Sequence, residues 1–305
     1  MATPSIAMIP SAYKAEKLYS VLPTNGNGDL DVVRASSATR VNKDGLIELV
    51  GSNVPRLDYS DGSCPSLLLE PQSTNLLPYS EDFSDASWVK TRVINVSNNT
   101  TSPNGGLNAD KLSETSNLGL HAISVNSTTT IGAVYSFSIF VKKGSNSYIQ
   151  FLFGTSNVAG DPYVNFDVNT GVLQNNGVDS ASIEDFGNGW FKCVATYITA
   201  TTSFTNFISS IQSVSDGRAS SFTGDVANNF YIYGAQLEQQ SSATSYIPTT
   251  GATVTRLEDV VDLDLTPFSL TSITETFSNG STNVITTIPI TYEVSKGEIS
   301  SIIAI

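Results

Sequence analysis

Few side chains of this protein have the chemistry that catalysis requires. His121 is the only histidine of the 305 residues, so a Ser-His-Asp or Cys-His arrangement would need it as the base. It lies in the strand-like run from Leu118 to Val125, which contains no nucleophile motif. We therefore expect a surface or edge-strand histidine rather than a catalytic base.

Acidic residues occur as neighbours in the sequence, at Glu81-Asp82, Glu184-Asp185 and Glu258-Asp259. Glycoside cleavage requires two carboxyl groups about 5–9 Å apart across a cleft. Neighbours on one strand point to opposite faces instead. Each pair is therefore expected at a solvated turn or strand end, and the sequence predicts no enzyme and no catalytic residue.

Aromatic side chains indicate a different chemistry, because a flat ring can stack on the apolar face of a pyranose. Tyr148 and Tyr163 fall out of phase with the apolar faces of their segments, which places them on a polar face. Trp190 is also out of phase, which predicts a rim or outer-face position, and Trp88 follows the first predicted strand of the central region. These four residues are our carbohydrate-binding candidates. The alternative is that large aromatics plug the ends of a sandwich core.

Short strands must position these side chains. Apolar residues alternate with polar ones over residues 135–141, 149–153 and 164–168, between glycine- and asparagine-rich breaks. A period of two with one apolar face indicates half-buried strands, and the spacing is typical of an all-β sandwich or barrel. We predict an all-β fold with a β-sandwich core.

Composition excludes several partners. Charged residues make up 14% of the chain, against about 25% in an average soluble domain. The formal net charge of −13 argues against binding to nucleic acids or to anionic lipid headgroups. Neither a signal peptide pattern nor a membrane-length apolar run occurs, so we expect a protein made in a cytoplasm and not secreted by the usual route.

The two cysteines, Cys64 and Cys193, provide no disulfide framework and no metal-ligand spacing. Cys193 alternates in phase with apolar neighbours, so we expect it to be a small buried residue rather than a reactive thiol.

The sequence around the sandwich divides into three further segments. Residues 1–33 contain a short strand-like piece that is flanked by two prolines and ends in a glycine-rich turn, which predicts an extended N-terminal arm or a strand added to the main sheet. Residues 34–75 form a β-ribbon, with a hairpin turn at Asp44-Gly45 and the run Leu67-Leu-Leu69 covered on both faces. Residues 263–305 form a β-meander whose apolar last strand should be paired in an assembly. We expect this meander to serve in trimer formation or in docking to a larger assembly. The alternative is that it extends the sandwich.

Six blocks of sequence resemble one known family. In order along the chain, they lie at residues 34–40, 53–59, 67–71, 74–83 followed by Trp88, 183–190, and 231–238 with 243–251 and 254–256. Together they are similar to the phage head spike fibre domain family, found in fibre and spike proteins of tailed bacteriophages. The likeness covers about residues 10–260 and does not clearly reach the C-terminal meander.

The resemblance implies a jelly-roll sandwich over residues 76–262, similar to the carbohydrate-binding modules of glycan-degrading enzymes. Such modules often carry a structural calcium ion, which takes about six to eight oxygen ligands. Glu81, Asp82 and Glu238 lie near the matching strand ends and are the calcium candidates; no other cofactor is implied.

The family also implies a virion structural protein, assembled in the host bacterial cytoplasm as a head fibre, tail fibre, spike or capsid decoration protein. We expect a homotrimer that contacts capsid or other virion proteins and attaches weakly, through many copies, to host-surface glycans. The alternative is a capsid- or tail-cementing protein without a ligand.

Overall fold

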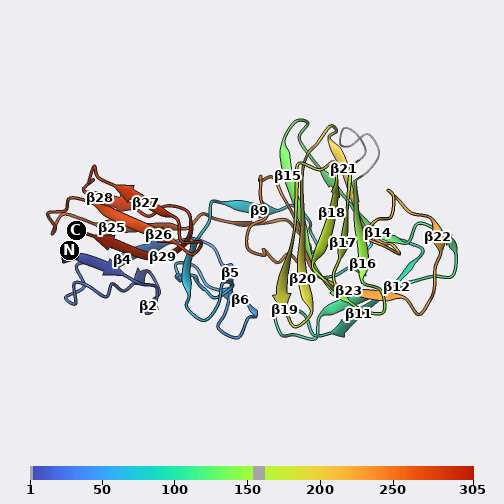
Figure 1. Cartoon of the computed structure of the whole chain (residues 1–305), viewed down its shortest axis with the longest axis horizontal. Coiled ribbons are helices and arrows are strands. Elements are labelled where there is room, and N and C mark those ends of the chain that lie inside the picture. The colour runs from blue at the N-terminus through green and yellow to red at the C-terminus, as the bar shows by residue number, and fades with distance from the viewer. Residues whose placement is uncertain (1–2, 154–161) are drawn as a thin grey trace. The chain divides into compact units, whose positions relative to one another are not determined.

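The chain folds into two compact units made of strands and turns (Figure 1). The structure is a computed structural model that describes residues 3–153 and 162–305. Thr74–Val254 forms unit 2, and Met1–Ser73 together with Thr255–Ile305 forms unit 1. Within the described residues we find no helix capable of crossing a membrane.

Unit 2 is a sandwich of two antiparallel six-stranded sheets, which we name after a central strand of each. The β16 sheet has the order β10 (Trp88–Thr91), β14 (Ala122–Thr128), β21 (Ser203–Ser210), β16 (Tyr148–Phe153), β17 (Tyr163–Asp167) and β18 (Val172–Asn176). The β15 sheet has the order β11 (Val93–Thr100), β12 (Ala109–Glu114), β23 (Asn229–Glu238), β15 (Val134–Lys143), β20 (Trp190–Ile198) and β19 (Ser180–Gly187). Two short strands, β13 (Leu118–Gly119) and β22 (Phe222–Thr223), pair beside them.

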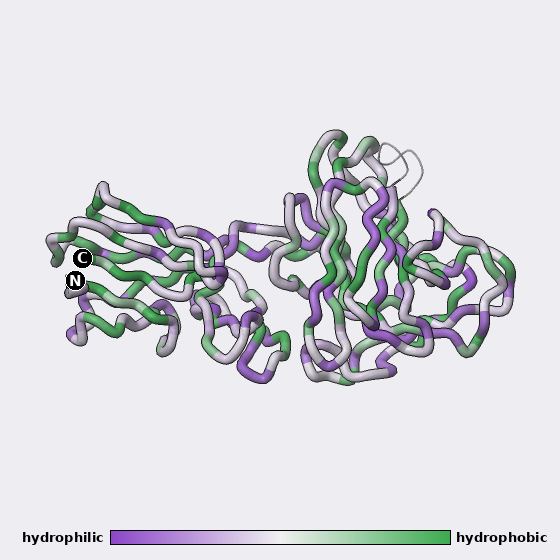
Figure 2. Tube along the Cα trace, viewed as in Figure 1, coloured by the Kyte–Doolittle hydropathy of each residue, from purple (hydrophilic) through white to green (hydrophobic). Residues whose placement is uncertain are grey.

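The core of unit 2 lies between these sheets and is built by the predicted alternation. Phe137 of β15 and Phe151 of β16 meet edge to face with ring centroids 5.1 Å apart, and Phe166 of β17 lies 4.8 Å from Phe151. Figure 2 shows hydrophobic and hydrophilic positions interleaved along the strands. The jelly-roll β-sandwich prediction is confirmed. Cys193 is fully buried in this core, which raises the pKa of its thiol and leaves it unreactive.

Unit 1 is a second, smaller pair of sheets. One sheet contains β27 (Thr282–Ile285), β26 (Ile273–Phe277), β29 (Gly297–Ala304), β8 (Ser66–Leu69) and β7 (Leu57–Asp58), with β1 (Ile6–Met8) also paired to β29. The other contains β2 (Tyr13–Lys14), β3 (Lys17–Leu18), β4 (Leu30–Val33), β25 (Val260–Asp264) and β28 (Thr291–Glu293). A two-stranded sheet of unit 1 pairs β5 (Ala38–Val41) with β6 (Ile47–Val50). The chain also forms a separate two-stranded sheet from β9 (Ser73–Asn75) and β24 (Val254–Arg256).

Unit 1 corrects the division of the chain expected from the sequence. The predicted arm at residues 1–33, the ribbon at 34–75 and the meander at 263–305 are not separate segments, because they share one apolar core. The last strand, β29, is not a free edge: it pairs with β26 on one side and with β8 and β1 on the other. Each of these ribbons buries too little alone, and joining them gives the small sheets a common core.

Local expectations within unit 1 are confirmed. Strands β5 and β6 form the predicted hairpin, and Gly45 supplies the positive φ, 74°, of its turn. Leu67, Leu68 and Leu69 are all buried, so both faces of β8 are covered.

Candidate functional site

Both tryptophans are covered, which leaves neither ring open as a carbohydrate-binding candidate requires. Trp88 is 1% exposed; its indole N–H donates to the Tyr79 carbonyl oxygen at 2.8 Å, and its ring packs 4.9 Å from Phe83. Trp190 does lie on the outer face of the β15 sheet, but it is 2% exposed and donates to the Thr101 carbonyl oxygen at 3.1 Å. Stacking a sugar requires an open ring face, and neither tryptophan offers one. The alternation of β20 predicted the face of Trp190 but not the segment that covers it.

Tyr148 and Tyr163 lie half-buried on the outer face of the β16 sheet, the face expected for them. Tyr148 opposes Asp167 and Tyr163 opposes Leu152, so the two tyrosines stand at opposite ends of the β16–β17 pair. Four residues of strand separate them along this pair, or about 13 Å. A chain of sugar rings could span such a distance only if the surface between them were open.

A strap formed by residues 212–220 closes that surface. Between the tyrosines, Gln150 and Asn165 are fully buried, and the Gln150 amide donates to Asn165 Oδ1 at 2.6 Å. Asn165 Nδ2 donates to two carbonyl oxygens of the strap, at 2.8 and 2.7 Å. Gln150 donates to the Gly217 carbonyl oxygen at 3.1 Å and accepts from the Ala219 N–H at 2.8 Å. The strap therefore divides the predicted tyrosine platform.

A groove on the outer face of the β15 sheet is the site that sequence reasoning missed. It has a volume of about 280 Å³ and is lined by Ser180, Ala181, Ser182, Glu184, Lys192, Val194, Thr196, Ser241, Ser242 and Ala243. We call it the serine groove. Its floor comes from paired positions of β19 and β20, such as Ser182 opposite Val194, and residues 241–243 form a wall. The only signal in the sequence was the polar phase of these two strands.

The two charged residues of the serine groove differ in their exposure and in their hydrogen bonds. Glu184 and Lys192 oppose each other across β19 and β20. The Lys192 ammonium is half-buried and donates to the Thr244 carbonyl oxygen at 3.1 Å, whereas Glu184 is exposed. Five serine and threonine hydroxyls complete the lining. Hydroxyls both donate and accept hydrogen bonds, so the groove can bind a polar, uncharged surface without leaving its partners unpaired.

The three predicted calcium ligands do not form one site. Glu81 accepts from the hydroxyls of Tyr233 and Tyr246 at 2.9 and 3.0 Å. The Glu238 carboxylate is bound instead by Thr244, whose backbone N–H donates at 2.9 Å and whose hydroxyl donates as well. In residues 3–153 and 162–305, no three His, Cys, Asp or Glu side chains are placed to hold a metal ion. Glu81 and Asp82 do line a small acidic pocket of about 160 Å³ with Ser97, Asn98, Asn108 and Asp110.

His121 is structural in its contacts, and it is fully buried rather than at the surface as expected. Its Nδ1 lies 2.9 Å from the Arg92 carbonyl oxygen, and its Nε2 lies 3.3 Å from that of Phe222. With both ring nitrogens facing backbone carbonyls, the imidazole is not oriented to take a proton from a hydroxyl or thiol nucleophile.

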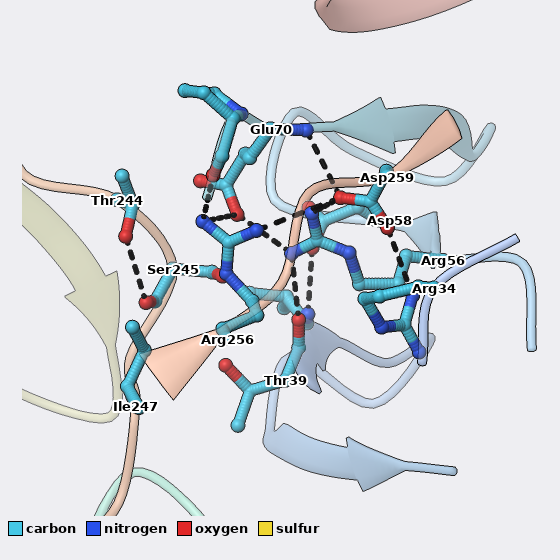
Figure 3. Close-up of polar contacts among 12 residues, drawn as sticks. Arg34, Thr39, Arg56, Asp58, Glu70, Thr244, Ser245, Ile247, Arg256 and Asp259 are labelled. Carbon is cyan, nitrogen blue, oxygen red and sulfur yellow. Dashed lines mark hydrogen bonds and ion pairs between the residues drawn. The ribbon is translucent and has the colours of Figure 1, made fainter. Parts of the chain in front are cut away.

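Asp259 corrects another expectation, because it is buried in unit 1 rather than solvated at a strand end (Figure 3). Its carboxylate accepts from Arg34 at 2.8 Å and also binds Arg56, which pairs with Glu70 at 2.7 Å. Arg256 lies 3.4 Å from the same Glu70 carboxylate. Burial lowers the pKa of Arg34, although its hydrogen bond to Asp259 opposes this shift.

This ion network explains what several resemblance blocks do in the structure. Arg34, Arg56, Glu70 and Arg256 come from four different blocks, and each is held in the network rather than at a ligand surface. These residues therefore fix the packing of unit 1, and they do not by themselves identify a binding site.

Comparison with known proteins finds similar folds among solved structures. No family model and no curated protein matches the sequence. Similar solved structures include TmCBM61 in complex with β-1,4-galactotriose, with a TM-score of 0.32, 15% identity and coverage of 54% of this chain and 99% of that chain. The CBM22-1 xylan-binding domain of Paenibacillus barcinonensis Xyn10C has a TM-score of 0.32 and 13% identity, over 56% of this chain and 94% of that one.

Tailspike protein 4 of bacteriophage CBA120 is also similar, through its enzymatically active domain. The TM-score is 0.31 and the identity 12%, over 53% of this chain but only 21% of that chain. Likenesses of this size carry no argument about ligand or activity. Membership in the phage head spike fibre domain family stays a prediction from the sequence blocks.

Proposed function

We propose that this chain is a non-enzymatic attachment protein of a tailed-bacteriophage virion and that unit 2 binds host-surface glycans in the serine groove. The groove is the observation that carries the glycan-binding part. It lies on paired strands of a packed sandwich, so its hydroxyls are held on a rigid surface. The virion part rests on the six blocks of sequence that resemble phage spike proteins.

Glycan binding suits the lining of the groove. Ser180, Ser182 and Thr196 present hydroxyls along two neighbouring strands, and Val194 adds a small apolar patch between them. A sugar ring offers the complementary pattern of hydroxyls at its edge and C–H groups on its face. Because no aromatic ring is among the described residues that line the groove, a single site should bind weakly. Several copies in one particle would raise the apparent affinity by about 10²–10⁴.

Attachment requires an anchor, and unit 1 is the proposed one. Apolar side chains remain exposed on it, among them Ile290 at 73% and Val284 at 56%. Exposed apolar surface of this kind can be buried against other virion proteins or in a homotrimer. We accordingly propose a trimeric protein located in the virion.

Titration of purified chain with a panel of oligosaccharides tests the proposal. Ser182→Phe should fill the groove and abolish binding, because Ser182 is exposed and its replacement leaves the core intact. Ser203→Phe, at an exposed position of β21, is the matched control and should bind as the unaltered chain does. Binding that survives Ser182→Phe but is lost in Tyr148→Ala with Tyr163→Ala would move the site to the tyrosine face.

A cementing protein without a ligand is the second candidate. The burial of Trp88 and Trp190 favours it, because the aromatic platform expected of a sugar-binding surface is not open. It predicts that particles lacking the protein lose stability to heat or low ionic strength but adsorb to cells normally. Reduced adsorption with unchanged particle stability would reject it.

A further inference from the structure

We infer that the serine groove selects neutral sugars over sugar acids and that Glu184 is the residue that determines this specificity. The inference rests on the proposed glycan-binding function and adds the chemical class of the ligand. It depends on how the two charged residues of the groove are partnered.

Among the described residues, Lys192 is the only cation that lines the groove, and one of its three N–H donors is already used by the protein. Its ammonium donates to the Thr244 carbonyl oxygen at 3.1 Å and is half-buried, which directs it toward the wall. A carboxylated sugar would need a free cation to offset the loss of its hydration. Within the lining, the remaining polar side chains are hydroxyls and one carboxylate, and none of these supplies a positive charge.

Glu184 makes the groove unfavourable for anions and favourable for diols. Its exposed side chain is a carboxylate, and the whole chain has a formal net charge of −13. The overall charge therefore repels an acidic sugar, and Glu184 offsets the positive charge of Lys192, which faces it across the two strands. A carboxylate accepts hydrogen bonds through two oxygens, so it can bind two adjacent sugar hydroxyls at once.

The remaining lining fits an uncharged ring. The hydroxyls of Ser180, Ser182 and Thr196 lie on the same face as Glu184, at alternate positions of β19 and at the facing position of β20. Val194 lies in the same row and can contact the C–H face of the ring. The ligand class that this surface recognises is a neutral hexose with two adjacent free hydroxyls.

The test compares Glu184→Gln with Asp185→Asn. Both remove one negative charge, but Asp185 is the next residue of β19 and does not line the groove. Full-length chain is titrated with a neutral galactose- or glucose-type oligosaccharide and with an oligogalacturonate, at low and at high salt. Trp fluorescence on heating checks that each variant is folded.

The neutral oligosaccharide should bind at both salt concentrations, and the oligogalacturonate should not bind even at low salt. Glu184→Gln should weaken neutral-sugar binding roughly tenfold by removing a charge-assisted hydrogen bond, whereas Asp185→Asn should leave it unchanged. Equal effects of the two variants, or a preference for the oligogalacturonate, overturns this inference and leaves the proposed function standing. Failure to bind any glycan overturns both.

Discussion

The two units of this protein bury polar groups in different ways. Unit 1 holds three arginines and two carboxylates in one largely buried network, and a further buried carboxylate at Glu275. Unit 2 buries neutral amides, such as Gln150 and Asn165, and carboxylates bound by neutral donors, such as Glu114, which accepts from the Ser210 hydroxyl and the Asp225 N–H. Unit 1 is assembled from segments far apart in sequence, and charged pairs with strict geometry can specify how such segments meet. Unit 2 relies on its alternating strands, and its polar contacts fix loops.

The largest effect expected from this difference is that of Asp259→Asn. The change leaves Arg34 and Arg56 buried without the negative charge that both contact, and breaking a buried pair costs about 3–5 kcal/mol. Calorimetry should show a lower transition temperature for unit 1. Both tryptophans, Trp88 and Trp190, lie in unit 2, so their fluorescence should report an unchanged transition.

Phe151→Ala is the matched control in the other unit. Removing a ring that packs against Phe137 and Phe166 should cost about 3–5 kcal/mol as well, and here the tryptophan fluorescence should report the loss. If each variant shifted the calorimetric and the fluorescence transitions equally, the two units would unfold together. The difference in how the units bury polar groups would then not explain their stability.

A smaller effect is expected when the strap of unit 2 loses its anchor. Asn165→Ala removes two hydrogen bonds to strap carbonyl oxygens in a fully buried position. Leaving those acceptors unpaired should cost about 1–3 kcal/mol. Amide hydrogen exchange should become faster in residues 212–220 while the core strands keep their protection. The loss should not depend on salt, because no charge is involved; a strong salt dependence would contradict the neutral character of this network.

The smallest effect should appear in the response of the two units to acid. Burial alone would raise the pKa of Glu275, but hydrogen bonds from Ser295, Tyr292 and Asn283 outweigh it and lower this pKa. Because the carboxylate titrates lower in the folded state, its contribution is present above the usual glutamate range and is lost as the pH falls through the folded pKa. Glu275 should therefore lower the stability of unit 1 on acidification, whereas Asp262 and Glu298 of the same unit, whose pKa values are raised by burial, oppose this loss.

Asp110 in unit 2 should respond in the opposite direction. Burial raises its pKa, although hydrogen bonds from Asn95 and Asn98 oppose the shift. A raised pKa favours the folded state when the group is protonated, so this contribution is lost as the pH rises and regained toward acid. In calorimetric scans between about pH 7 and pH 3, the transition temperature of unit 1 should fall relative to that of unit 2 as the pH is lowered. Glu275→Gln should reduce this difference, and an unaltered difference would assign it to other carboxylates.

Much of the fold could be predicted from local pattern. The alternation over residues 135–141 and 149–153 predicted the faces of β15 and β16, and Asp44-Gly45 predicted the β5–β6 hairpin. Candidate site residues were predicted less well. The outer-face position of Trp190 was predicted correctly, but its ring is covered and bonds to the Thr101 carbonyl oxygen. Asp259 was expected in solvent but is buried. The serine groove was missed because its wall, residues 241–243, is distant in sequence from β19.

The sequence by itself determined which side of each strand faces the core, since a period of two follows from the geometry of a single strand. It also determined the low charge and the scarcity of catalytic groups. Only the tertiary structure decided which outer faces stay open and which carboxylates are buried. Arg34 and Asp259 are 225 residues apart in the sequence. Val214 of the strap, whose carbonyl oxygen accepts from Asn165, lies 49 residues after it. Contacts between segments so distant depend on how the sheets pack, and no local pattern encodes that packing.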